Sequence, residues 1–264
     1  MHGIGQIEKK IYEQRKYHPL VIPQLDSDKH DLKSAENWLR HVQDLELSLI
    51  TLGGSTVNTL HAQEVLDLAI KDYNFDVIIY TSTNPNFIHG TKGRTAIYWG
   101  QIPNAHNTFY MWDGLISNSL NLEVNNLEPL PTVYVFDDRG SVGSSNWVAR
   151  STPIPREKPE ISLAVAKAAE YLGIRFYIMA GGSGSLNPPP LTHVERLVQK
   201  SNLFIIPTSG INTLETAKSL FAVGADAIHI GNRLEKSGGF KVLDEISKAI
   251  KHYPGKDFFE IRYN

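Results

Sequence analysis

The alternation of short apolar runs with helix-length amphipathic stretches constrains the fold of this chain more than any other sequence feature. Parallel strands joined by crossover helices produce this pattern, because a strand covered on both faces reads as a short apolar run. The runs predict eight strands, over residues 20–25, 47–52, 77–80, 110–116, 132–136, 176–180, 203–206 and 227–230. Helices are expected over residues 34–45, 59–71, 160–172, 192–200, 213–223 and 240–252, several of them with a Ser or Thr cap.

Eight strands alternating with helices predict an α/β fold, a modified TIM (β/α)8 barrel. Residues 81–107 are rich in Asn, Gly, Thr and His and have no helical period where the third crossover helix should lie, so we expect the barrel to lack a regular third helix. A second polar stretch, residues 137–159, predicts a turn at Asp138–Gly140, then a β-excursion and an extended connection.

Length and composition set the class of protein. With 264 residues and 41% hydrophobic content, the chain fits one barrel domain over residues 1–264, with a short N-terminal helical extension. A net charge of −2 provides no basic surplus for nucleic-acid binding. The absence of cysteine excludes disulfides, thiolate metal sites and cysteine nucleophiles.

The chain has no apolar run of the roughly 20 residues that a membrane span requires, and its N-terminus lacks the apolar core of a signal peptide. We therefore expect a soluble, cytoplasmic protein. A lipid substrate would require either transient contact with a membrane or a short, water-soluble isoprenoid.

Three loops of small residues follow the sixth, seventh and eighth predicted strands. They are Ala180–Ser185, Pro207–Ile211 and Ile230–Asn232. Glycine lets the backbone approach an anion closely, while hydroxyl and amide groups supply donors. Any one loop could be only a tight turn, but loops after the last strands of a barrel meet at one face. Together they predict a phosphate site, with Gly181 in the first loop.

The front of the barrel carries a second group of polar residues. Asp26, Asp28 and Lys29 follow the first strand, and the glycine-rich loop with Ser55 follows the second. Carboxylate oxygens and substrate phosphates suit Mg²⁺, so these residues could hold the metal with a diphosphate. The alternative for the two aspartates is a helix cap ahead of Ser34.

The order of these segments along the chain resembles the geranylgeranylglyceryl phosphate synthase family, with its bacterial heptaprenylglyceryl relatives and a moenomycin-pathway prenyltransferase. The I-D-P-D-K and G-G-S/T boxes of the family resemble Leu25–Lys29 and Gly53–Ser55. Its Y-L-E-A-G-S-G segment resembles Tyr177–Gly184 with one extra glycine, its G-G-G-I-R-T-x-E-x-A segment resembles Thr208–Ala217, and its G-A-D-x-I-x-x-G-N box matches Gly224–Asn232. The family's barrel also lacks a regular helix after the third strand.

The resemblance implies a Mg²⁺-dependent prenyltransferase that joins an isoprenyl chain from a prenyl diphosphate to a phosphorylated three-carbon acceptor, and it suggests a homodimer. Asp26 and Ser55 would bind the metal, and Asp26, Lys29 and Ser55 would form the catalytic group. The acceptor phosphate would be held by Tyr177, Gly181, Ser183, Gly184, Ser209, Gly210, Gly231 and Asn232.

One departure from the family pattern bears on the acceptor. The family's glutamate, which holds the hydroxyls of glycerol phosphate, aligns with Met179. A glutamate about 4 Å from an acceptor carboxylate would cost on the order of 4 kcal/mol at an effective dielectric constant near 20. Met179 therefore suggests the branch that prenylates the 2-hydroxyl of 3-phosphoglycerate with a farnesyl or similar chain, as in phosphoglycolipid biosynthesis. The alternatives are a glycerol 1-phosphate acceptor, a non-catalytic phosphate-binding paralogue and an unrelated sugar-phosphate isomerase barrel.

Motifs leave several features open, including the general base, the prenyl chain length and the oligomeric state. His89, Lys92 and Arg94 are candidates for binding an acceptor carboxylate. Aromatic residues concentrated in one stretch could line an isoprenoid channel or simply pack in the core. They are Tyr98, Trp99, Phe109, Tyr110 and Trp112.

Overall fold

The computed structural model of the chain describes residues 3–54, 59–81, 88–106, 115–116, 118–185 and 187–263. Within them are eight strands, β1 (Leu20–Asp26), β2 (Leu49–Gly54), β3 (Asp76–Thr81), β4 (Thr95–Gln101), β5 (Glu128–Phe136), β6 (Phe176–Ala180), β7 (Phe204–Pro207) and β8 (Ala227–Ile230). The sheet order is β7-β6-β5-β4-β3-β2-β1-β8, and every adjacent pair is parallel. A single parallel bridge between Thr208 and His229 joins its two ends, so the sheet forms a nearly closed barrel.

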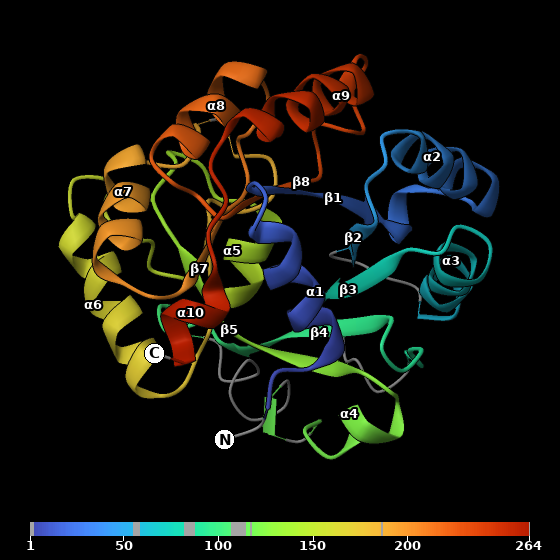
Figure 1. The fold of residues 1–264 in the computed structure, drawn as a ribbon, viewed down its shortest axis with the longest axis horizontal. Coiled ribbons are helices and arrows are strands. Elements are labelled where there is room, and N and C mark those ends of the chain that lie inside the picture. The colour runs from blue at the N-terminus through green and yellow to red at the C-terminus, as the bar shows by residue number, and fades with distance from the viewer. Residues whose placement is uncertain are drawn as a thin grey trace.

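Helices surround this barrel (Figure 1). The described α-helices are α1 (Gln6–Arg15), α2 (Leu32–Asp44), α3 (Thr59–Lys71), α4 (Asn121–Val124), α5 (Ser144–Ala149), α6 (Pro159–Tyr171), α7 (Leu191–Lys200), α8 (Leu214–Ala222), α9 (Gly239–Ala249) and α10 (Phe258–Tyr263). Two local signals fix helix starts: Asp31 accepts the N–H of Ser34 at 2.8 Å in α2, and Thr213 accepts the N–H of Thr216 at 3.2 Å in α8. Among the described helices, none is long and apolar enough to cross a bilayer.

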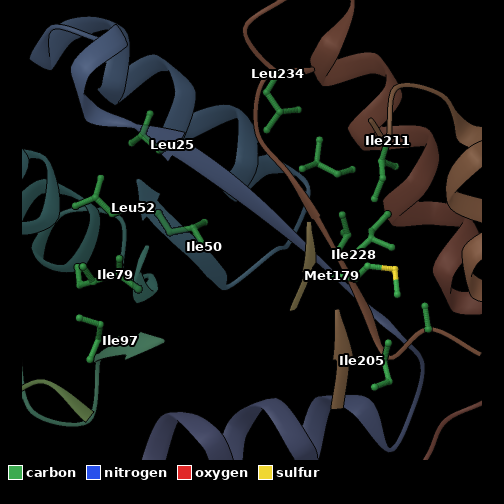
Figure 2. Close-up of a cluster of buried hydrophobic side chains, with 14 of the residues drawn as sticks. Leu25, Ile50, Leu52, Ile79, Ile97, Met179, Ile205, Ile211, Ile228 and Leu234 are labelled. Atoms are coloured by element: carbon green, nitrogen blue, oxygen red, sulfur yellow. The ribbon is translucent and has the colours of Figure 1, made fainter. Parts of the chain in front are cut away.

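Successive residues of each strand alternate between the barrel interior and the layer of helices. On β6, Phe176 and Ile178 belong to the interior cluster, which also contains Phe204 and Ala227. Tyr177 and Met179 belong instead to the larger cluster between the sheet and the helices. Figure 2 shows part of this outer cluster, with Met179 beside Ile205 and Ile228.

The amino-terminal end of the barrel is closed by α1 and α10. Tyr12 of α1 stacks on Phe176 at 5.9 Å and on Phe258 at 5.2 Å between ring centroids. The carboxylate of Glu128, at the start of β5, accepts the N–H groups of Ile7 and Glu8 at 2.9 and 2.8 Å, and so caps α1 from a distant part of the chain. This predicted N-terminal extension is therefore part of the barrel's packing.

The fourth strand differs from the sequence prediction. It runs over Thr95–Gln101 and not over residues 110–116, of which only 115 and 116 are described, in a π-helical turn. In the connection between β3 and β4, the described residues 88–94 contain no helix. The 137–159 stretch contains a short helix, α5, that the predicted β-excursion did not include.

Candidate active site

A cavity of about 360 Å³ opens at the carboxyl ends of the strands. Its lining includes residues of β1, β2, β3, β4, β5 and β8 and of the loops that follow β6, β7 and β8. This is the end of a (β/α)8 barrel where strand-to-helix loops supply ligand contacts. Six predicted site residues from the last three loops line it, in pairs: Ser183 and Gly184, Ser209 and Gly210, and Gly231 and Asn232.

The loop backbones are arranged to accept an anion. The N–H groups of Ser183, Gly184, Ser209, Gly210 and Asn232 have no acceptor among the residues that the structure describes. Groups of this kind that converge on one cavity can bind an anion without competition from the chain itself. The loops therefore form a candidate phosphate site.

The loop after β7 has a restrained geometry. Ser209 has a φ of 66°, in the left-handed region that non-glycine residues rarely adopt. Gly210 follows with a φ of 68°, and a Cβ there would lie 2.2 Å from the backbone oxygen of Asn187. Glycine is thus required at position 210 for both its backbone conformation and its close packing.

Side chains link this phosphate site to the front of the barrel. Asn232 donates to the hydroxyl of Ser183 at 3.0 Å and accepts from the Lys29 ammonium at 2.8 Å. Lys29 also contacts the Asp26 carboxylate at 2.5 Å. Lys29 therefore joins the two groups of site residues that the sequence predicts separately.

Asp26 is buried and lines the cavity, where it also accepts a hydrogen bond from the amide of Gln24. Gly53 of β2 packs against it, since a Cβ at position 53 would lie 2.8 Å from the Asp26 Oδ1 atom. Among the described residues, no group of three His, Cys, Asp or Glu side chains could hold a metal. One carboxylate beside a cavity still fits Mg²⁺, which takes one or two protein carboxylates and completes its shell with substrate phosphates and water. Ser55, the other predicted ligand, lies outside the described residues.

Arg139 binds the backbone of the loop after β7, a role that the sequence did not indicate. Its buried guanidinium forms a bidentate pair with Asp137, in which Nη2 lies 2.8 Å from Oδ2. Its Nη1 donates to the carbonyl oxygens of Thr208 and Ser209 at 3.2 and 2.9 Å. Burial raises the pKa of Asp137, and the neighbouring Arg139 opposes that rise.

A second buried polar group lies inside the barrel. The His229 imidazole lines the cavity, with Nε2 2.5 Å from the Thr51 hydroxyl and Nδ1 3.4 Å from the Thr208 hydroxyl. Tyr80 packs edge-to-face on the ring at 4.8 Å between centroids. Burial lowers the pKa of His229 to about 3, so the imidazole is neutral in the folded protein.

Four predicted site residues are not among those that line the cavity. One of them, Lys29, contacts the lining residues Asp26 and Asn232. Tyr177 and Met179 face the helices, and Gly181 packs against the side chain of Arg139. Because strand residues alternate, the barrel-facing position at the end of β6 is Ala180, which packs against Phe136 and Ala149. The Met179 side chain therefore does not contact the cavity, and Ala180, which is not a lining residue either, has no carboxylate.

Other predicted groups divide in the same way. Tyr98 and Trp99 line the cavity together with Tyr80, Tyr134 and Phe136, whereas Phe109, Tyr110 and Trp112 lie outside the described residues. His89, Lys92 and Arg94 are not among the lining residues, and Arg94 instead pairs with Asp76 at 2.7 Å. Arg233 and Lys236, which the sequence analysis missed, do line the cavity.

The parallel sheet and the cavity at its carboxyl end define this chain as a (β/α)8-barrel protein with a candidate ligand site at the carboxyl ends of its strands. Within that class the chain belongs to the PcrB family, whose family model matches residues 11–251.

Curated relatives cover nearly the whole chain. The geranylgeranylglyceryl phosphate synthase of Pyrococcus furiosus is 29% identical over 252 residues, which cover 94% of this chain and 98% of the relative. That of Nitrosopumilus maritimus is 32% identical over 243 residues, which cover 90% and 94%.

Solved structures support the fold. The (S)-3-O-geranylgeranylglyceryl phosphate synthase of Thermoplasma acidophilum, in complex with its substrate sn-glycerol-1-phosphate, matches with a TM-score of 0.83 and 24% identity over 92% of this chain and 97% of that one. A tryptophan synthase of M. tuberculosis matches less well, with a TM-score of 0.57 and 13% identity over 92% of this chain and 98% of that one. At these identities the similarity concerns the barrel fold alone.

Proposed function

We propose that this chain transfers a prenyl group from a prenyl diphosphate to a hydroxyl of glycerol 1-phosphate and forms an ether. It is a prenyltransferase, like the geranylgeranylglyceryl phosphate synthases that are its curated relatives. The observation that carries the choice of a phosphorylated acceptor is the set of N–H groups around the cavity, at Ser183, Gly184, Ser209, Gly210 and Asn232, that have no acceptor among the described residues. A phosphate bound there would direct the rest of a three-carbon acceptor toward the barrel axis.

The donor diphosphate would lie near Asp26 and Lys29, beside the proposed phosphate site. Mg²⁺ would be held by Asp26, with Ser55 proposed as a further ligand, and when bound it supplies positive charge that stabilises the departing diphosphate. The Lys29 ammonium, 2.8 Å from Asn232, lies between the two proposed phosphate positions and can neutralise charge on either. The aromatic residues of the cavity provide apolar surface for the isoprenoid.

In the reaction, the acceptor hydroxyl oxygen forms a bond to C1 of the prenyl chain while the bond from C1 to the diphosphate breaks. The hydroxyl proton leaves during or after this step, and the released diphosphate is one base that can take it. The work of the protein is to hold the two substrates in line and to stabilise the charge that develops on the leaving group.

A second acceptor, 3-phosphoglycerate, is favoured by one observation. Asp26 is the one carboxylate among the described residues that line the cavity, whereas Arg233 and Lys236 lie in the same lining. An acceptor with an additional carboxylate would therefore meet more positive than negative charge. The similarity to glycerol phosphate enzymes makes glycerol 1-phosphate the first choice, and homodimer formation and transient membrane contact stay predictions.

The decisive experiment incubates the purified protein with Mg²⁺ and geranylgeranyl or farnesyl diphosphate, and offers glycerol 1-phosphate and 3-phosphoglycerate in separate tubes. Mass spectrometry detects the prenylated product. An ether formed with glycerol 1-phosphate supports the proposal, and an ether formed only with 3-phosphoglycerate selects the second acceptor. No product with either would indicate a phosphate-binding paralogue without this activity.

A further inference from the structure

A chain of three buried side chains crosses the barrel interior between the two proposed substrate positions. Thr51 comes from β2 and His229 from β8, and Thr208 directly follows β7. His229 and Thr208 both line the cavity, and Thr208 directly precedes the Ser209–Gly210 loop. These three side chains therefore lie where the carbon skeleton of a loop-bound phosphate ester would extend.

The hydrogen-bonding capacity of these groups leaves one acceptor position open. With the imidazole proton on Nδ1, the Thr51 hydroxyl donates to Nε2 at 2.5 Å and Nδ1–H donates to the Thr208 oxygen at 3.4 Å. The Thr208 hydroxyl itself donates to the carbonyl oxygen of His229 at 3.3 Å. The remaining lone pair of Thr208 is then available to a hydroxyl group in the cavity.

The Thr208 oxygen and its neighbours are suited to bind a neutral hydroxyl group. The barrel-facing position at the end of β6 is Ala180, so no carboxylate from that strand is available to hold acceptor hydroxyls. Burial keeps the imidazole neutral, and the edge-to-face contact with Tyr80 fixes the plane of its ring.

We propose that His229 is a positioning residue that, through Thr208, holds a hydroxyl of the phosphorylated acceptor. This inference rests on the proposed function, because it assumes a phosphate ester with a free hydroxyl. It predicts that the Thr208 oxygen adds to the affinity of the protein for glycerol 1-phosphate but not to its affinity for inorganic phosphate.

The test measures binding by calorimetry, with glycerol 1-phosphate and inorganic phosphate as separate probes. We expect Thr208→Val and His229→Leu each to weaken glycerol 1-phosphate binding up to about tenfold, while inorganic phosphate binds as before. The double variant should be no weaker than either single variant, because the two residues act as one unit. His229→Asn, which can still present an N–H toward Thr208, should recover most of the affinity.

His193→Leu is the matched control. His193 is equally buried but lies in the helix layer, where it pairs with Ser162 at 2.8 Å and with the carbonyl of Arg156 at 3.0 Å. Its replacement should lower the melting temperature without changing either affinity.

Kinetics add an independent readout. Thr208→Val should raise the KM for the acceptor and leave the KM for the prenyl diphosphate unchanged. Equal losses for both probes, or additive losses in the double variant, would overturn the inference. Absence of product from the wild-type protein would instead refute the proposed function, and the binding comparison would still decide the role of His229.

Discussion

Replacement of Arg139 by methionine should destabilise the protein strongly, because it leaves a buried carboxylate without its partner. Both side chains of the Asp137–Arg139 pair are almost completely buried, at 1% and 0% exposed. Removing one member of a buried ion pair costs about 3–5 kcal/mol, which corresponds to roughly 10 °C in Tm for a chain of this size. The carbonyl oxygens of Thr208 and Ser209 lose a charged donor in the same step.

The pH dependence of this loss has a definite sign. Burial already raises the pKa of Asp137, and removal of the opposing Arg139 charge raises it further. A carboxyl whose folded pKa lies above its unfolded value stabilises the fold when it is protonated, and this contribution is lost as pH rises. The deficit of Arg139→Met should therefore shrink as the pH is lowered from 7 toward 4.

Urea denaturation at several pH values measures this effect. The dependence of the unfolding free energy on urea concentration should be the same in all variants if they unfold in the same transition. Arg139→Met combined with Asp137→Asn should recover much of the stability, since no buried charge remains. Arg40→Met is the control, because Arg40 forms an exposed pair with Glu36 and should change little. A loss below about 1 kcal/mol for Arg139→Met, or a deficit that grows in acid, would refute this reasoning.

Three further predictions concern the cavity. Asp26→Asn should lower kcat by about 100-fold or more in the prenyl transfer assay, because it removes the carboxylate proposed to hold Mg²⁺; unchanged kcat would exclude that role. Gly184→Ala, which has open space but a φ of 77°, should cost about 1–2 kcal/mol in denaturation, whereas Gly210→Ala should cost more and also weaken phosphate binding, because its Cβ would meet backbone. His229 is protonated near pH 6.5 in the unfolded chain but only near pH 3 in the folded protein. The free energy of unfolding of the wild type should therefore fall, on acidification through that range, by on the order of 4 kcal/mol relative to that of His229→Gln. Parallel curves of stability against pH for the two proteins would contradict this.

Much of the barrel could be predicted from the sequence because its strands are short apolar runs between regular helices. The fourth strand could not, since Thr95–Gln101 contains glycine and polar residues and lies within a polar stretch. Its interior positions are Ala96, Tyr98 and Gly100, and the small size of Gly100 is required by a close approach of the Thr132 backbone. Such a strand is determined by its neighbours in the sheet and not by its own apolar pattern.

The candidate site could be predicted at the level of loops but not of side-chain direction. The residues of β6 are apolar and completely buried on both faces, so their pattern does not show which ones point inward. A shift of one residue exchanges the two faces, and this is the difference between Met179 and Ala180. Arg139 and His229 escaped prediction for another reason: the Thr208 and Ser209 carbonyl oxygens that Arg139 contacts, and the Thr51 hydroxyl that His229 contacts, lie far from them in the sequence.

The contacts of α1 also govern when the barrel can assemble during synthesis. This first helix depends on Glu128 for its N-terminal cap and on Arg175, whose Nη2 lies 2.7 Å from the Glu8 carboxylate. Glu128 lies near the midpoint of the 264-residue chain and Arg175 well beyond it, so both partners leave the ribosome long after α1. The first helix must therefore wait for the later strands, and a nascent chain stalled before Arg175 would expose its apolar face to chaperones or to aggregation.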